Sequence, residues 1–393
     1  MTKLIILIVN IVFFGSVQLI TIPLIMPIFP SVFFVTFILA LEAVIGFGII
    51  MISNDFYGLY RKKLWAFSHQ HLYTNIGLLL GISIIQFLTS ICFFYSSHPS
   101  RTPILIQVIL LGLGIIPSVI FSKFLLEKKK SYNFVFIFAS IICLLVSITL
   151  GIAPLSFSII NNKLFIWIII YMMGVTFYSL SYVMQEKYIL MTNTKASTKF
   201  QLAFYTRFIQ LLLTVLMFWI EAFFGYDISY SNFFVSFYES FIKSTILFFS
   251  SQYNFWIIQL YVISRIISYI LSIYLNEISA NYSTIISGIN TQITALFFAI
   301  FPYLNKGFQY PITITMLNIF FNILSILFWI KGEKNNQTEP FGSELGSVID
   351  NQNGSIETSQ LESSSEKNSK PTEVTHLLSS SIISFTNMEK NYT

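Results

Sequence analysis

Long apolar stretches follow one another along the first 331 residues of the chain. A helix needs about 20 mostly apolar residues to cross the hydrocarbon core of a bilayer. Short clusters of charged residues or proline separate the stretches. Ten windows of this length can be drawn: Leu4–Met26, Val32–Ser53, Tyr73–Tyr95, Pro103–Leu126, Tyr132–Ala153, Leu164–Gln185, Leu202–Phe224, Phe255–Leu275, Tyr282–Phe301 and Tyr310–Ile330. The pattern predicts an all-α polytopic membrane protein with ten transmembrane helices.

Basic residues are distributed unequally between the two sides that this topology defines. With the N-terminus in the cytosol, twelve Lys and Arg residues lie in cytosolic segments. Four lie on the opposite side: Arg101, Lys163, Lys243 and Lys306. Cytosolic segments of membrane proteins are enriched in Lys and Arg. We therefore expect both termini in the cytosol.

The ten windows divide evenly at the Pro154–Lys163 loop into halves 1–153 and 164–331. Because each half has an odd number of helices, the second half enters the membrane in the opposite orientation. Inverted-repeat transporters have this arrangement. We expect a transporter domain over 1–331, built from two inverted five-helix repeats.

The loop 226–254 is the only long loop on the non-cytosolic side. Within it, polar residues repeat at helical spacing opposite apolar ones, which predicts an amphipathic helix on the membrane surface. The alternatives are a short re-entrant piece and a disordered loop. The polar set is Ser236, Glu239, Ser240 and Lys243, and the apolar set is Phe233, Phe234, Phe237, Phe241 and Ile242.

Composition excludes several classes of protein. Only 10% of residues are charged, against about 25% in soluble domains. Basic loops account for the net charge of +5 better than nucleic-acid binding does. Cys92 and Cys143 lie inside apolar windows, where they form neither a disulfide scaffold nor a zinc site. Enzyme motifs are absent, and we expect no enzyme, metal or cofactor.

Polar side chains inside spans usually face a bundle interior, a partner or a water-filled cavity. Four spans carry polar faces at helical spacing, and the tenth carries a similar stripe that helix packing alone can explain. The sixth has Tyr171, Tyr178, Tyr182, Gln185 and Glu186; the seventh Arg207, Gln210 and Thr214; the eighth Tyr261, Arg265, Ser268, Tyr269 and Ser272; the ninth Ser283, Ser287, Asn290 and Thr294; the tenth Thr315, Asn318, Asn322 and Ser325.

Glu42 is the most conspicuous of these residues, because it lies near the middle of the second window. Arg265 is the most deeply placed basic candidate partner. One interpretation is a fixed ion pair between them. The other is a carboxylate that takes up and releases a proton, since burial favours its neutral form and a nearby cation its charged form.

Residues 332–393 form a separate, acidic segment rich in Asn, Gln, Ser, Glu and Thr, a composition typical of disordered tails. It contains EVTHLL, which has the form of an acidic dileucine sorting signal, with Glu373, Leu377 and Leu378 as its key residues. Such a signal on a cytosolic tail is a candidate for clathrin-adaptor binding. An inert tail is the alternative.

The ten-span topology, the Gln-Glu pair after the sixth span and the long loop after the seventh resemble the drug/metabolite transporter superfamily. Within it the chain is most similar to the chloroquine-resistance-transporter-like group, through GIIPSVIFSKFLLEKKKSYNFVFIFASII, SLSYVMQEKYIL, FIQLLLT and NYSTIISGINTQ. The resemblance implies a central cavity, alternating access and export of small organic solutes from an acidic compartment. It also implies substrate or coupling roles for Glu186 and Gln210. The chain lacks the cysteines that parasite members carry in the seventh-to-eighth loop.

We expect a secondary active, proton-coupled transporter of amino acids, peptides, thiol peptides or cationic drugs in an endolysosomal or vacuolar membrane. Tyr178, Tyr182, Tyr261, Tyr269, Gln210 and Asn290 are expected to contact substrate, Arg207 and Arg265 to attract a carboxylate, and Glu42 and Glu186 to handle protons. The alternatives are a Golgi or ER nucleotide-sugar transporter of the same fold, and a multi-span membrane enzyme or receptor.

The titrating interpretation of Glu42 makes a direct prediction. Glu42→Gln should abolish uptake driven by a pH gradient but spare exchange of substrate, because only the driven process needs a proton to bind and leave. Uptake into proteoliposomes with and without a pH gradient measures both. Normal accumulation by the variant against a gradient would exclude the coupling role.

Overall fold

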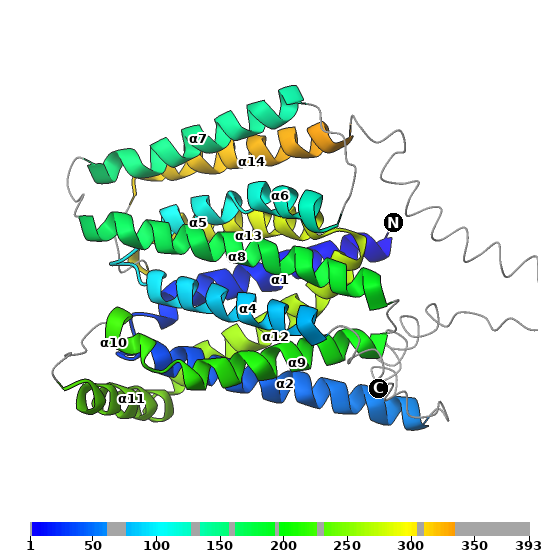
Figure 1. Cartoon of the computed structure of the whole chain (residues 1–393). Coiled ribbons are helices and arrows are strands. Elements are labelled where there is room, and N and C mark those ends of the chain that lie inside the picture. Colours follow the sequence, from blue (N-terminus) through cyan, green and yellow to red (C-terminus); the bar gives the residue numbers. More distant parts are fainter. Residues whose placement is uncertain are drawn as a thin grey trace, which may run out of the picture. The chain divides into compact units, whose positions relative to one another are not determined.

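The structure is a computed structural model that describes residues 2–60, 76–126, 134–156, 162–192, 196–225, 232–304 and 310–334. The dileucine motif and nearly all of the tail lie outside these residues. Every long regular element described is an α-helix (Figure 1). The helices are α1 Thr2–Ile25, α2 Val32–Tyr60, α4 Ile76–Ser96, α5 Ile104–Gly112, α6 Ile115–Leu125, α7 Phe134–Ser156, α8 Asn162–Thr192, α9 Ala196–Leu216, α10 Ile220–Phe224, α11 Phe233–Ser250, α12 Gln252–Ile278, α13 Ala280–Ile300 and α14 Ile312–Lys334.

Nine spans within the described residues are long and apolar enough to cross a membrane, with α5 and α6 counted together. The chain is therefore a multi-pass helical membrane protein, as expected. The seventh predicted window corresponds to α9 and α10 and is not one of the nine. Lys199, Gln201 and Arg207 make α9 more polar than the others. It nevertheless packs along α2 and α4 within the bundle.

The fourth predicted window is not one helix but two, α5 and α6, separated at Leu113 and Gly114. Pro117 has no N–H to donate to the preceding turn, which favours a kink. The carbonyl oxygen of Gly114 accepts a hydrogen bond from the backbone N–H of Ser118 at 3.2 Å and another from Ser179 Oγ on α8 at 2.8 Å. A Cβ at Gly114 would lie 3.1 Å from that same hydroxyl. The glycine therefore lets α8 approach closely and add a hydrogen bond beside the break.

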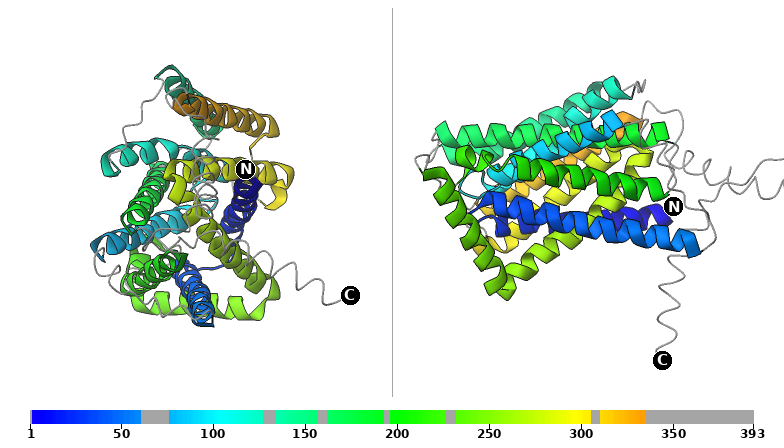
Figure 2. Two further views of the ribbon diagram at one scale, coloured as in Figure 1. Left: turned by 90° about the vertical axis from the view of Figure 1, so that its right-hand side faces the viewer. Right: turned by 60° about the horizontal axis from the view of Figure 1, so that its bottom comes forward.

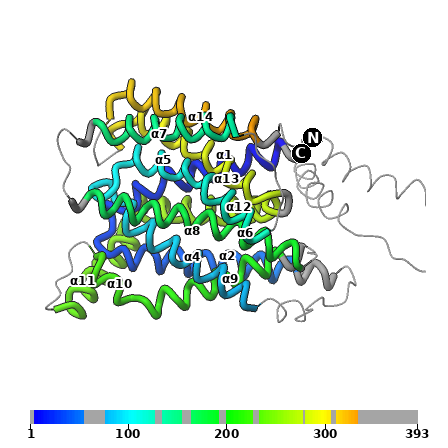
Figure 3. The backbone as a smooth tube through the Cα atoms, turned by 45° about the horizontal axis from the view of Figure 1, so that its top comes forward, coloured from blue at the N-terminus to red at the C-terminus, as the bar shows by residue number. Residues whose placement is uncertain are grey.

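Helices pair across the two halves of the chain. α7 packs along α14 at one side of the bundle and α2 along α9 at the other, and both views show this order (Figures 1 and 3). Between them, α1 packs along α12, α4 along α8, and α5 against α13. Most of the extensive contacts therefore join helices that are far apart in sequence.

The polar stripe of the tenth window belongs to the α7–α14 pair. Ser140 Oγ donates to the carbonyl oxygen of Ser325 (2.9 Å), and Ser325 Oγ donates to that of Ser140 (3.1 Å). Asn318 Nδ2 donates to the carbonyl oxygen of Ser147 at 2.9 Å, and Asn322 donates to its hydroxyl. Helix packing thus accounts for the three residues of this stripe that bond to α7.

The predicted helix in the long loop is present as α11, which runs across the direction of the long helices (Figure 2). The apolar residues expected to form a single face lie in two different environments. Phe237 and Phe241 pack on Phe33 at the start of α2. By contrast, Phe234 and Ile242 are exposed, because the start of α2 occupies only one side of the helix.

The buried carboxylate of Glu221, on α10, caps the N-terminus of α2. Its two oxygens accept hydrogen bonds from the backbone N–H groups of Val32 and Phe33, both at 3.0 Å. The hydroxyls of Ser31 and Tyr95 donate to the same carboxylate. A negative charge at a helix N-terminus is favourable, because it satisfies orphan donors and opposes the helix dipole.

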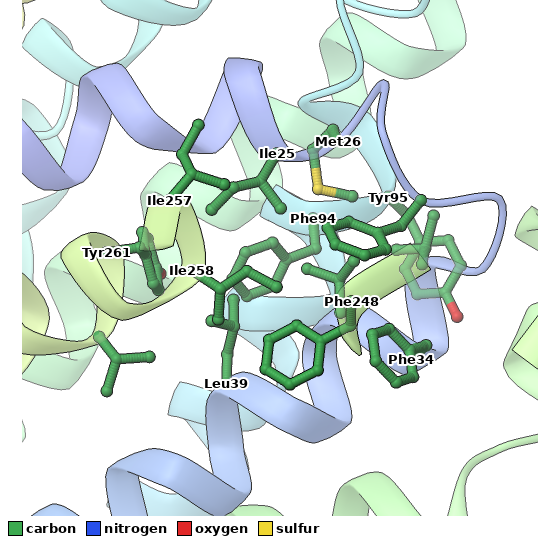
Figure 4. Close-up of a cluster of buried hydrophobic side chains, with 14 residues drawn as sticks. Ile25, Met26, Phe34, Leu39, Phe94, Tyr95, Phe248, Ile257, Ile258 and Tyr261 are labelled. Carbon is green, nitrogen blue, oxygen red and sulfur yellow. The ribbon is translucent and has the colours of Figure 1, made fainter. Parts of the chain in front are cut away.

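An apolar cluster lies next to this junction, where α1, α2, α4, α11 and α12 meet (Figure 4). Phe94 and Tyr95 come from α4, Phe248 from α11, and Ile257 and Ile258 from α12; all are under 10% exposed. The cluster shields the Glu221 junction from solvent, which strengthens its hydrogen bonds.

Replacing Glu221 tests the junction. Glu221→Ala leaves the two backbone donors of α2 buried without an acceptor, so we expect the free energy of unfolding to fall by about 2–4 kcal/mol. Denaturation of purified protein in mixed micelles measures it. Glu239→Ala removes an equivalent charge from an exposed position of α11 and should change stability by less than about 0.5 kcal/mol. Equal effects of the two substitutions would contradict the capping role.

Candidate functional site

A cavity lies between helices of both halves of the chain. Its empty volume, including space open to solvent, is about 1060 Å³. α1, α4 and α5 from the first half line it, together with α8, α9, α12 and α13 from the second. Six of the predicted site residues line this cavity: Tyr178, Tyr182, Arg207, Tyr261, Arg265 and Tyr269.

The polar faces of α8 and α12 both turn toward the cavity. Tyr171, Tyr178, Tyr182 and Gln185 line it from α8, and Tyr261, Arg265, Ser268, Tyr269 and Ser272 from α12. Residues three, four and seven apart share one side of a helix, so each stripe enters the cavity as a unit. The hydroxyls of Tyr178 and Tyr182 are 2.5 Å apart.

Tyr269 connects several of these groups. Its hydroxyl oxygen accepts a hydrogen bond from Gln86 Nε2 at 3.1 Å and another from Gln185 Nε2 at 3.4 Å. It also lies 3.4 Å from Thr206 Oγ1. The Arg207 guanidinium stacks over its ring at 4.3 Å, a cation–π contact. Tyr269 therefore joins α4, α8, α9 and α12 at the cavity wall.

Among the described residues, the cavity lining carries two positive charges and no acidic side chain. Arg207 Nη1 donates to Gln210 Oε1 at 2.6 Å, and Arg265 Nη1 donates to the Tyr261 hydroxyl at 3.1 Å. The two guanidinium charges are close enough to interact with each other. The two arginine side chains make this wall of the cavity electropositive.

Two of the expected substrate contacts do not line the cavity. Gln210 lies behind Arg207, where its Nε2 donates to Ser90 Oγ at 2.6 Å. Asn290 turns toward α1, and a Cβ at Gly15 would lie 2.1 Å from its Nδ2. In this conformation Gln210 orients the arginine, and Asn290 packs between helices.

Glu42 lies at the seam between α2 and α12 and not in the cavity lining. Gln259 Nε2 donates to its Oε1 at 2.8 Å, and its Oε2 is buried without a hydrogen-bond partner. Among the described residues, Glu42 and Arg265 form no ion pair. Arg265 instead donates a hydrogen bond to the Tyr261 hydroxyl. The interpretation as a fixed ion pair is therefore wrong for this conformation.

Glu186 is 1% exposed and also lies outside the cavity lining. Its Oε2 accepts a hydrogen bond from the backbone N–H of Ala280, the first residue of α13, at 2.8 Å. Beside it, Asn276 Nδ2 donates to Gln185 Oε1 at 3.1 Å. A polar junction thus joins α8, α12 and α13 at the end of the bundle opposite Glu221 (Figure 1).

Sequence reasoning missed the polar face of α4. Gln86 and Ser90 line the cavity from this helix, Ser97 lines it from the position just after the helix ends, and Gln107 lines it from α5. Ser83, Gln86, Ser90 and Ser97 follow at steps of three, four and seven, so the same periodicity could have found the stripe. Among the described residues, no cluster of His, Cys, Asp and Glu side chains could hold a metal ion.

Comparison with known proteins adds no relative. A scan against models of protein families finds no match. A search of curated proteins likewise finds no similar sequence.

The unpaired charges of the cavity should reduce stability. Arg265→Met keeps most of the aliphatic stem but removes the charge that opposes Arg207, so we expect the free energy of unfolding to rise by about 1 kcal/mol. Thermal denaturation of purified protein in detergent measures the change. Lys243→Met, at an exposed position of α11, is the control. A loss of stability in Arg265→Met alone would show that Arg265 stabilises the fold.

Proposed function

We propose that this protein is a secondary transporter of small organic solutes, which alternates access to its central cavity by movement of two five-helix halves. The observation that carries the proposal is the cavity itself, because helices from both halves line it. Movement of one half against the other would open such a site first to one side of the membrane and then to the other.

The pairing of helices supports two inverted repeats of five helices each. With α5 and α6 counted as one helix, the first five helices α1, α2, α4, α5 and α7 correspond in order to α8, α9, α12, α13 and α14. Exchanging each helix for its counterpart turns the α1–α12 pair into the α8–α4 pair. The same exchange returns α7–α14, α2–α9 and α5–α13 to themselves. α9 takes the seventh place, which makes ten helices. The mutual hydrogen bonds of Ser140 and Ser325 on α7 and α14 have the self-complementary form expected next to a two-fold axis.

The broken helix α5–α6 supports alternating access. Discontinuous spans next to a midplane site are common in transporters, because they allow parts of one helix to move separately. Leu111, one turn or less from the break, lines the cavity. The Glu186 and Glu221 junctions lie at opposite ends of the bundle and are candidate gates.

Proton coupling through Glu42 belongs to this proposal. Its buried and unpartnered Oε2 is a place where a proton can bind, and Gln259 lies across the seam between the halves. Glu186 is engaged with the N-terminus of α13 and would couple only if that contact breaks. We further propose an endolysosomal or vacuolar membrane, supported only by EVTHLL in the tail.

Counterflow in proteoliposomes tests the transport function. Purified protein should accumulate a labelled solute into vesicles preloaded with the same unlabelled solute, in a screen of amino acids, small peptides and nucleotide sugars. Ser268→Trp places an indole in the cavity and should reduce exchange about tenfold or more, whereas Lys243→Gln should not. No exchange of any solute by folded wild-type protein would favour a receptor or enzyme.

A further inference from the structure

Two polar atoms on cavity-lining residues are buried without a hydrogen-bond partner. They are Arg207 Nε, a donor, and Gln86 Oε1, an acceptor. Both residues are 5% exposed. An unmet buried donor or acceptor costs about 1–3 kcal/mol, more when the group is charged. Unpartnered groups on residues of a cavity wall indicate which hydrogen bonds a bound molecule can add when those side chains turn toward it.

Arg207 is held in a fixed orientation. Its guanidinium carbon lies over the Tyr269 ring, and Nη1 donates a hydrogen bond to Gln210, which in turn donates to Ser90. The open Nε therefore belongs to a planar, positioned group, which is the geometry that carboxylate and phosphate oxygens fit best. Arg265 adds a second charge from α12.

Within the part of the chain that the structure describes, no acidic side chain lines the cavity to balance these two charges. An anionic group that binds between the arginines would relieve their mutual repulsion, whereas a cation would add to it. The tyrosine rings of α8 and α12 would then face the uncharged part of the solute. Cationic drugs, one of the substrate classes expected from the sequence, fit this cavity poorly.

Gln86 adds a second requirement. Its Nε2 donates to the Tyr269 hydroxyl, which leaves Oε1 as the open end of the amide. Only a donor, such as an ammonium, hydroxyl or amide N–H group, can satisfy that oxygen. Arg207 and Gln86 both contact Tyr269 and both line the cavity, so the two unpartnered atoms belong to neighbouring residues of one cavity wall.

We propose, on the basis of the transport function above, that the substrate is a small organic anion. Its carboxylate or phosphate binds Arg207 and Arg265, and a hydrogen-bond donor near that group binds Gln86. Amino acids, small peptides, hydroxy acids and sugar phosphates have this chemistry. Gln210 is a positioning residue that acts through Arg207.

Counterflow with matched probes tests the anionic group. The pairs are alanine and alaninamide, alanylalanine and its C-terminal amide, and glycerol phosphate and glycerol. The anionic group of at least one pair should raise exchange about tenfold or more, as expected for a charged hydrogen bond. The pair that responds distinguishes carboxylate from phosphate. Arg207→Lys and Arg265→Gln should each remove the preference, and Lys243→Gln should preserve it.

The Gln86 contact is tested with alanine and propionate, which share a carboxylate but differ in the ammonium donor. Wild-type protein should prefer alanine, and Gln86→Met should exchange the two equally while Arg207→Lys weakens both. If glycerol phosphate is the responding probe, glycerol phosphate and methyl phosphate replace this pair.

The outcomes separate the two proposals. Equal exchange of acids and their uncharged or cationic partners would overturn the anion site and leave transport intact. Preserved preference in both arginine variants would also overturn it. If wild-type protein exchanges none of the probes, the proposed function fails for these solutes, and the anion site fails with it. Melting temperatures of the two arginine variants show whether each is folded. If Arg207→Lys does not fold, Arg265→Gln still tests the positive charge of the cavity from a different helix.

Discussion

Inside a bilayer, backbone N–H and C=O groups have no water to bond to, and this constraint governs the whole structure. It selects helices, whose hydrogen bonds are internal, and it makes every helix end or break a place that needs a partner. The start of α2 has the Glu221 carboxylate, and the start of α13 has Glu186. Beside the α5–α6 break, the Gly114 carbonyl gains a second donor from the Ser179 hydroxyl. These polar residues therefore maintain an otherwise apolar fold.

Some buried polar atoms are exceptions to this rule, and two of them belong to residues that line the cavity. Arg207 and Gln86 each keep one buried atom without a partner, and the arginines have no acid beside them in the lining. A protein under selection for stability alone would pair or remove such groups. Their persistence is understandable if a second molecule completes the site for part of each working cycle.

Much of the fold and part of the site can be predicted from the sequence, because both depend on local periodicity. Apolar length predicts the spans, and the 3.6-residue repeat brings Tyr178 and Tyr269 to one cavity from separate helices. The α5–α6 break was missed because a hydropathy window averages over Pro117. Glu221, Asn290 and the Glu42–Gln259 contact could not be predicted, since each depends on residues between 126 and 275 positions away that only the packed bundle brings near.

The seam between α7 and α14 has an implication for the origin of the protein. Ser140 and Ser325 each give a hydroxyl hydrogen to the carbonyl of the other. A contact of this form can be made by two identical helices that meet in opposite directions. If the two halves are the inverted repeats proposed above, a five-helix ancestor inserted in both orientations would have associated with itself through this seam. Among the described residues that line the cavity, both charges, Arg207 and Arg265, belong to the second half.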